Sequence, residues 1–400
     1  MRYMIKAALV SPNHPEYGTA TVPFPIPSED YDRTMELLEG LGIGDPLRQD
    51  CQVDELDSNY SVLKRLEGRP VNVDELDYLA KRLDSFCTGE DAQFQAMAHR
   101  LDISDIKGFI NLTFSCQQAT VITDFSDLEQ AGKDHALTLN GGAMPSAEYD
   151  KLDGQAIALD LIQSGKGTVT PYGVVFDNGM ELEQVYDGQH FPLYFYEMPL
   201  LNLEIRGKRS DSSVEYLSLP ASDKQIERTL LRAGVRDMDN AVWDVESGEL
   251  SEPVALAIKL ENEDILSLNK LCRGIEPLDT EQKEKLDAVV LMAKPGSAGE
   301  VRQLAENLDL FDFAPDVQTL EDYGRYLICE SGHFEYDENL EDFYNYHYFG
   351  EVRSREDGGE FTDLGYVSYH GTLTLDELMH DDPAEQYQQE QEPENGPVMM

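Results

Sequence analysis

The residues with the clearest chemical potential are carboxylates, and they are dense among aromatic rings near the C-terminal end of the chain. The stretch His333–Phe349 holds seven Phe or Tyr and five Asp or Glu in 17 residues. Carboxylates bind Lys and Arg as phosphates do, and rigid aromatic rings supply contact area. The stretch therefore predicts a protein-binding surface. In the alternative interpretation, Leu340, Phe343 and some tyrosines pack a core and the acids form its solvated face.

No other residue pattern nominates a reaction. The chain contains neither G-x-S-x-G nor H-E-x-x-H. The segment Ser164–Thr168 resembles a phosphate-binding loop only faintly, because Asp160 stands where the first glycine is required. The five cysteines are dispersed without C-x-x-C, and the eight histidines do not cluster. We therefore expect no catalytic residue, no cofactor and no metal site. An enzyme hidden among 78 carboxylates stays as an alternative.

The charge balance is the strongest signal in the composition. The chain carries 78 Asp and Glu against 31 Lys and Arg, a formal net charge of −47 over 400 residues. Such a polyanion repels nucleic acid and anionic membranes, so we expect neither as a direct partner. Because DNA carries one charge per about 1.7 Å of duplex, this excess at that density would match about 80 Å of helix. The sequence favours a protein partner built to hold a polyanion; an ordinary solvated acidic surface is the alternative.

The chain has enough apolar residues to fold. Hydrophobic residues make up 41%, with 20 Tyr and 15 Phe, whereas disordered acidic chains are poor in them. No apolar run reaches the length of a membrane span, and the N-terminal residues predict a strand rather than a secretion signal. Dispersed cysteines in odd number are typical of reduced thiols, so we expect a cytoplasmic protein. Residues 380–400 are rich in Glu, Gln and Pro, which predicts a disordered acidic tail.

The two halves of the chain resemble each other. Five segment pairs match in the same order at offsets of 189 to 196 residues, which predicts an internal duplication. The pairs are Asp32–Met35 with Glu227–Leu230, Val71–Lys81 with Leu260–Lys270, Asn111–Leu112 with Asn307–Leu308, Ser126–Lys133 with Thr319–Arg325, and Thr170–Val175 with Thr362–Val367. The predicted first copy spans 1–190 (β-rich to about 70, helical 71–115, mixed 116–190). The second spans 191–379 (β-rich to about 258, helical 259–306, mixed 307–379).

Short strands and capped helices must position the acidic residues, so the predicted class is α+β. We expect an elongated multi-domain chain in which each copy has a β-hairpin and helix unit, a helical unit and a mixed unit. Apolar alternation predicts strands at Arg2–Val10 and Thr19–Phe24. Ser or Asp caps predict helices over Ser28–Leu38, Ser222–Ala233 and Asp279–Ala293. Further caps are expected at Ser126 and Thr319, and closing β segments at Thr168–Phe176 and Phe361–His370.

The second copy resembles the ArdA antirestriction family of mobile genetic elements. The resemblance is carried by Asn307–Asp316, Leu320–Leu327, Leu340–Gly350 and Phe361–Val367. It implies an acidic, elongated protein that mimics bent B-form DNA and occupies the DNA groove of type I restriction–modification enzymes, so that a plasmid escapes cleavage. The chain departs from the family in having two copies, in the divergence of the first copy and in His347.

The resemblance and the charge together nominate a set of phosphate-mimicking carboxylates that would bind the partner. These are Asp309, Asp312, Asp316, Glu321, Asp322, Glu335, Asp337, Glu338, Glu341 and Asp342. The resemblance also implies packing by Leu308, Leu320, Tyr323, Gly324, Tyr346 and Gly365. We expect a monomeric pseudo-dimer or a homodimer. An acidic inhibitor or adaptor of another nucleic-acid enzyme, such as a CRISPR nuclease, is the alternative function.

Overall fold

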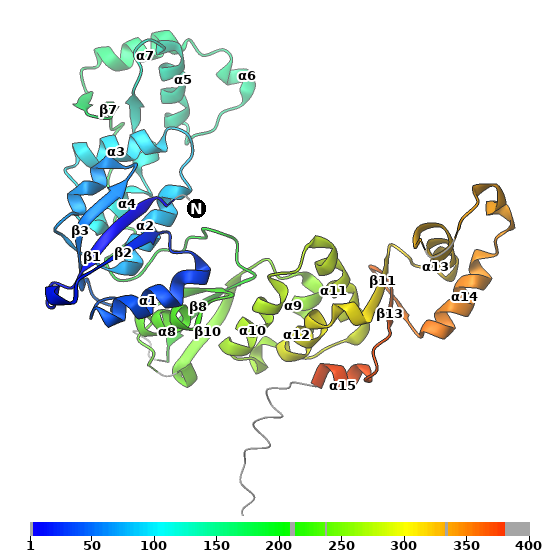
Figure 1. The fold of residues 1–400 in the computed structure, drawn as a ribbon. Coiled ribbons are helices and arrows are strands. Elements are labelled where there is room, and N and C mark those ends of the chain that lie inside the picture. Colours follow the sequence, from blue (N-terminus) through cyan, green and yellow to red (C-terminus); the bar gives the residue numbers. More distant parts are fainter. Residues whose placement is uncertain (1–2, 209–212, 237, 333–334, 381–400) are drawn as a thin grey trace, which may run out of the picture. The chain divides into compact units, whose positions relative to one another are not determined.

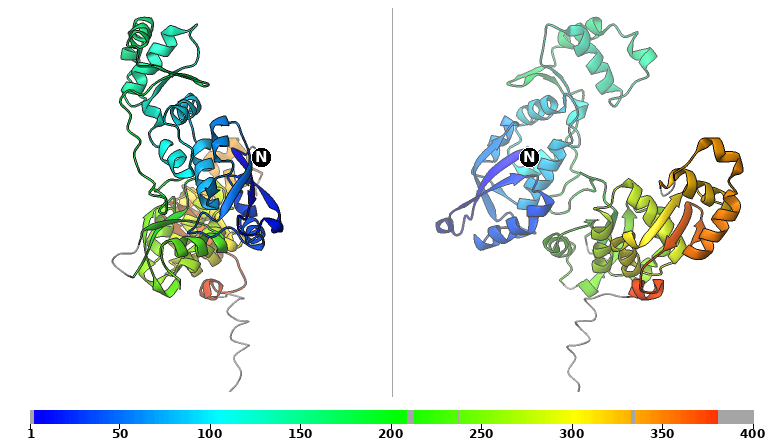
Figure 2. Two further views of the ribbon diagram at one scale, coloured as in Figure 1. Left: turned by 90° about the vertical axis from the view of Figure 1, so that its left-hand side faces the viewer. Right: turned by 45° about the vertical axis from the view of Figure 1, so that its right-hand side comes forward.

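The structure, a computed structural model, describes residues 3–208, 213–236, 238–332 and 335–380. It is a mixed α+β chain with several small antiparallel sheets, which confirms the predicted class (Figures 1 and 2). The chain divides into two compact units, of which the first comprises residues 1–197, 203–217 and 221–244 and the second the remainder. The predicted boundary between the two copies was defined by sequence similarity between the halves, whereas these units are defined by packing. The boundary at residue 190 therefore stays a prediction.

The first unit begins with a four-stranded sheet of order β2-β1-β3-β4 (Figure 1). The predicted N-terminal hairpin is present: β1 and β2 pair antiparallel, with Ile5 opposite Phe24. Alternation in the sequence decides which face of β1 packs on the core. Ile5, Ala7 and Leu9 are fully buried, and the residues between them are more exposed. The strands are β1 Ile5–Val10, β2 Thr19–Phe24, β3 Cys51–Ser58 and β4 Pro70–Val71.

Helices complete the core of the first unit. The helix expected from Ser28 begins at Tyr31 after a 3-10 turn and ends at Gly40. Asn72 caps the next helix through a capping box with Glu75, which satisfies amides that the helix itself cannot bond. The helices are α1 Tyr31–Gly40, α2 Val73–Asp84, α3 Glu90–Arg100 and α4 Ile106–Leu112.

A small mixed module follows in the same unit, with a sheet of order β5-β7-β6. Its helices α5 and α7 pack closely, because glycines 132 and 154 bring the two backbones into contact (Figure 1). Asp127 caps α5, so the predicted cap at Ser126 is wrong by one residue. The elements are β5 Thr120–Ile122, α5 Leu128–Leu139, α6 Ser146–Tyr149, α7 Gly154–Gln163, β6 Thr168–Thr170 and β7 Gly173–Phe176.

A three-stranded sheet of order β10-β8-β9 and helix α8 come next in the chain. Helix α8 has the capping box between Ser222 and Gln225, as its predicted start requires. Strand β10 contains Trp243, the single tryptophan of the chain. The elements are β8 Leu201–Gly207, β9 Glu215–Leu219, α8 Asp223–Arg232 and β10 Ala241–Ser247.

A buried cluster of charges joins α8 to α2 inside the first unit. The Asp74 carboxylate, which is 8% exposed, accepts hydrogen bonds from Arg228 Nη2 at 2.9 Å and from Arg232 Nη1 at 2.7 Å. Tyr31 donates its hydroxyl to the same carboxylate at 3.2 Å. Arg232 also pairs with the buried Glu215 at 3.2 Å. Because both arginines have carboxylate partners, they can stay buried, whereas burial of an unpaired charge would lower the free energy of unfolding.

The second unit contains four helices and then a second mixed module. The helix predicted over Asp279–Ala293 is present, with Asp279 as its cap. In the mixed module the sheet order is β11-β13-β12. The elements are α9 Glu252–Ala257, α10 Ile265–Ile275, α11 Thr280–Ala293, α12 Ala298–Glu306, β11 Phe311–Pro315, α13 Leu320–Arg325, α14 Tyr346–Asp357, β12 Glu360–Thr362, β13 Gly365–Tyr369 and α15 Leu375–His380.

The end of the second unit corrects one predicted boundary. His380 was expected to open the disordered tail, but it is the last residue of α15. Helix α15 packs against α12, which explains why the ordered chain continues past the predicted limit at residue 379. The rest of the predicted tail, 381–400, lies outside the described residues, as do His333 and Phe334.

Candidate functional site

The sheet of the second mixed module presents the first three predicted carboxylates. In β11 the side chains of Phe311 and Ala314 are buried, and that of Asp312 is exposed. Asp309, in the 3-10 turn Leu308–Leu310, and Asp316, directly after β11, are also exposed. Strand pairing with β13 fixes this edge, with Asp312 opposite Ser368. Asp316 adopts a positive φ of 59°, a conformation that Asp and Asn tolerate better than most residues.

Helix α13 presents two more predicted carboxylates in its first turn. Thr319 caps the helix as predicted: its hydroxyl accepts the Asp322 amide at 3.2 Å and donates to the Asp322 carboxylate at 2.6 Å. Glu321 and Asp322 are exposed. Negative side chains near a helix N-terminus are stabilised by the helix dipole. Asp322 therefore has a structural role in the cap besides any role in binding.

Two glycines fix α14 against α13. A Cβ at Gly324 would lie 2.0 Å from the carbonyl oxygen of Tyr346, and one at Gly350 would lie 1.8 Å from that of Leu320. Only glycine allows the two helix backbones to approach so closely. The residues implied for packing by the resemblance are buried, except Leu320, which is partly exposed.

Substituting Gly324 by Ala is therefore expected to loosen the module. The added methyl group meets backbone rather than a flexible side chain, so we expect the free energy of unfolding to fall by about 3 kcal/mol. Hydrogen exchange of the α13 and α14 amides should accelerate accordingly. Gly299, a helical glycine whose Cβ would meet nothing nearer than 3.9 Å, provides the matched control. Equal protection in Gly324→Ala and Gly299→Ala would show that the close approach is unimportant.

The connection between α13 and α14 carries the remaining predicted carboxylates. Glu335, Asp337 and Glu341 are exposed, whereas the side chains of Glu338 and Asp342 lie outside the described part of the chain. Arg325 holds Glu341: its Nη1 lies 2.8 Å from Oε1, and its guanidinium stacks 4.4 Å from the Tyr346 ring centroid. This arginine was not anticipated from the sequence, although a basic residue in the last turn of a capped helix is favourable and could have suggested it.

The aromatic side chains of this connection divide between core and solvent. Tyr346 is buried at 6% exposure, whereas Phe343 is 83% exposed and Tyr348 is 62% exposed. The alternative expectation that Phe343 packs the core is therefore wrong: its side chain, in the 3-10 turn before α14, is largely exposed. Leu340 lies outside the residues whose side chains are described.

All eight predicted carboxylates that the structure describes are exposed. Residues 307–379 hold 18 Asp and Glu against three Arg, so the module is strongly negative. In the described part of the chain, no cation lies within ion-pair distance of Asp309, Asp316, Glu321 or Glu335. His370 Nε2 lies 3.8 Å from Asp312, and Lys285 of α11 interacts electrostatically with both Asp312 and Asp309 from a greater distance. Carboxylates in this state can accept Lys or Arg from a partner without first breaking an internal ion pair.

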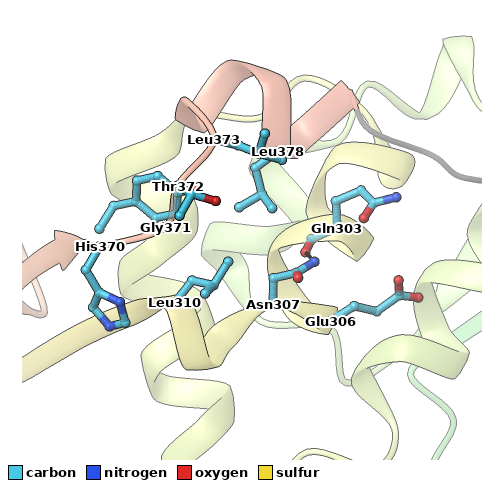
Figure 3. A pocket seen from close by; sticks show the side chains of 10 residues that line it. Gln303, Glu306, Asn307, Leu310, His370, Gly371, Thr372, Leu373 and Leu378 are labelled. Atoms are coloured by element: carbon cyan, nitrogen blue, oxygen red, sulfur yellow. Dashed lines mark hydrogen bonds between the residues drawn. The ribbon is translucent and has the colours of Figure 1, made fainter.

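A pocket of about 470 Å³ also lies in the second unit, between the end of α12 and the loop after β13 (Figure 3). Its lining includes the polar residues Gln303, Glu306, Asn307 and His370, and the His370 imidazole points away from the others (Figure 3). Leu310, Leu373 and Leu378 supply apolar surface (Figure 3). Within the described residues, no hydrogen bond or ion pair joins Glu306 to His370, so the pocket nominates no acid–base pair.

Comparison with known proteins adds no family assignment: no protein-family model matches the chain, and no curated protein matches it. The ArdA resemblance therefore rests on the segments quoted above. Across the described ranges, no three or more His, Cys, Asp or Glu side chains are grouped so that they could hold a metal ion. None of the helices in those ranges combines the length and apolarity needed to cross a membrane.

Proposed function

We propose that this chain is a DNA-mimic antirestriction protein that occupies the DNA-binding groove of a type I restriction–modification enzyme. It would act in the cytoplasm, without cofactor or catalysis, and protect a plasmid or other mobile element on entry. The observation that carries the proposal is the set of exposed carboxylates on the second mixed module. Five of them stand on a sheet edge and a helix end that are held by packing, and Glu335, Asp337 and Glu341 stand on the connection between α13 and α14.

Charge chemistry explains how such a surface would inhibit. A DNA-binding groove holds phosphates with Lys and Arg, and binding is driven largely by release of counterions. Carboxylates at fixed positions can pair with the same cations, although each carries one negative charge and no base. Fixed positions matter because a surface that must first be ordered would lose part of its binding free energy.

The proposal includes an internal duplication, and the helix caps support it. Four caps of the first half have counterparts 192 residues later: Asn72 and Asp264, Asp105 and Ser297, Asp127 and Thr319, Asp153 and Asn345. The sheets β5-β7-β6 and β11-β13-β12 have the same order. A constant offset across helices and sheet is difficult to explain by chance.

Further equivalent contacts support the same offset of 192 residues. Thr170 donates its hydroxyl to the Gly173 carbonyl at 2.8 Å, and Thr362 donates to that of Gly365 at 2.9 Å. The Cβ positions of glycines 132 and 324 approach the carbonyl oxygens of residues 154 and 346, respectively. The two copies would then form a covalent pseudo-dimer. Once one copy has bound the partner, the link would raise the effective concentration of the other copy at its own site.

Inhibition of DNA cleavage tests the proposal. The full chain is mixed with a purified type I restriction enzyme, ATP and an unmodified plasmid that carries its sites. We expect cleavage to stop near an equimolar ratio and to recover as salt rises from about 50 to about 200 mM. Undiminished cleavage at tenfold excess of the chain would contradict the proposal. Inhibition of a CRISPR nuclease alone, in a parallel reaction, would select the alternative function.

A further inference from the structure

Two aromatic side chains of the acidic module, Phe343 and Tyr348, are largely exposed. Phe343, at 83%, is the most exposed of the large apolar side chains that the structure describes, and Tyr348 is 62% exposed. The backbone beneath Tyr348 is held in place, because its amide donates to the Asn345 side chain at 3.1 Å in the cap of α14. Exposed rings on an ordered backbone can bind a partner with little loss of conformational freedom.

The charge around these rings limits what could cover them. Glu335, Asp337 and Glu341 of the same segment are exposed, and no Lys or Arg occurs between residues 326 and 352. Glu341 is already paired with Arg325, but an acidic or purely apolar partner would leave Glu335 and Asp337 uncompensated. A cationic protein surface fits both the rings and the acids.

The module already holds one arginine in this manner. The Arg325 guanidinium lies 4.4 Å from the centroid of the Tyr346 ring, and its Nη1 donates to Glu341 at 2.8 Å. Arginine suits this combination because its planar group stacks on rings while its N–H groups bond carboxylates. Lysine, a strongly hydrated point charge, gains less from the ring.

We propose that Phe343 and Tyr348 are anchor residues for arginine side chains of the partner protein. The inference rests on the proposed function in naming that partner as the DNA groove of a restriction enzyme, but the preference for arginine can be measured without it. At the offset of 192 residues, the counterparts in the first half are Lys151 and Ala156, which have no ring. The contact is therefore confined to the second half of the chain.

Two arms test the inference on the full chain. In the first, the affinities for deca-arginine and deca-lysine peptides are compared at equal ionic strength. We expect the wild-type chain to bind the arginine peptide about fivefold more tightly, because two ring contacts are available. The double substitution F343A/Y348A should abolish this preference, whereas F343Y/Y348F should retain it. Leu256→Ala removes another exposed apolar side chain, at 78% exposure, and should change nothing.

In the second arm, the dissociation constant for the purified restriction enzyme is measured with the same variants. F343A/Y348A should raise it at least tenfold, as expected for central aromatic contacts. An arginine preference that is absent in the wild type, or unchanged in F343A/Y348A, would overturn the inference. Enzyme binding unaffected by the double substitution would overturn it while leaving the proposed function intact. Failure of the wild type to bind the enzyme, with the arginine preference present, would reject the proposed function alone.

Discussion

Replacing five exposed carboxylates by their amides is expected to abolish inhibition of the restriction enzyme, although each single replacement has a small effect. The five are Asp309, Asp312, Asp316, Glu321 and Glu335, chosen because none caps a helix or pairs with an arginine of the module. An exposed ion pair contributes up to about 1 kcal/mol. Five lost pairs would cost about 3 kcal/mol, or roughly a hundredfold in the dissociation constant.

The salt dependence of binding should change with the same variant. Each lost contact lowers the magnitude of the slope of log affinity against log salt concentration by about one. The variant with all five replacements should therefore have a slope that is smaller in magnitude by about four or five. A second set of five exposed acids from the first unit has the same charge change and serves as the control: Glu36, Asp54, Glu55, Glu148 and Glu181.

Two outcomes would argue against the proposed surface. If the control set weakened binding as much as the test set, total charge rather than the second mixed module would determine affinity. If one amide replacement abolished inhibition in a folded protein, distributed mimicry would be the wrong mechanism. Thermal unfolding of each variant distinguishes loss of binding from loss of fold.

Asp74→Asn is expected to destabilise the first unit by about 3 kcal/mol or more at pH 7. The substitution leaves Arg228 buried without a carboxylate and leaves Arg232 with Glu215 alone, and removal of one partner from a buried ion cluster carries a cost of this size. Trp243, the single tryptophan of the chain, belongs to this unit, so urea unfolding followed by its fluorescence measures the effect. Asp54→Asn, at an exposed position, should leave the midpoint unchanged.

The Asp74 effect should depend on pH in a defined direction. Burial opposes ionisation of Asp74, but Arg228 and Arg232 outweigh it and hold its pKa below the ordinary value. A lowered folded-state pKa stabilises the protein above the unfolded value of about 3.9, and the stabilisation disappears as pH falls through the folded value. The stability difference between wild type and Asp74→Asn should therefore be full at pH 7 and shrink below about pH 4. A constant difference over this range would contradict the assignment.

Local features of the fold could be predicted from the sequence because they depend on neighbouring residues. Caps at Asp279, Thr319 and Ser222 and the alternation of β1 are all contained in windows of a few residues. The cap at Ser126 was misplaced because Asp127, next to it, is an equally good capping residue. Boundaries of this kind are decided by packing that a short window does not contain.

Contacts between distant residues could not be predicted. The pair of Asp74 and Arg228 joins side chains 154 residues apart, and neither position looks unusual in the sequence. The exposure of Phe343 and the burial of Tyr346 three residues later are decided by tertiary packing, which a short aromatic-rich window does not reveal. Exposure of the nominated acids was easier to predict, since ionised carboxylates without partners are rarely buried.

Competition with DNA tests the central claim most directly. A labelled duplex that carries the enzyme's site is bound to the restriction enzyme, and the full chain is then titrated while fluorescence anisotropy reports the DNA. If the acidic surface occupies the DNA groove, the duplex is displaced completely and its apparent dissociation constant rises linearly with chain concentration. A ternary complex of enzyme, DNA and chain, with the duplex still bound, would contradict the account.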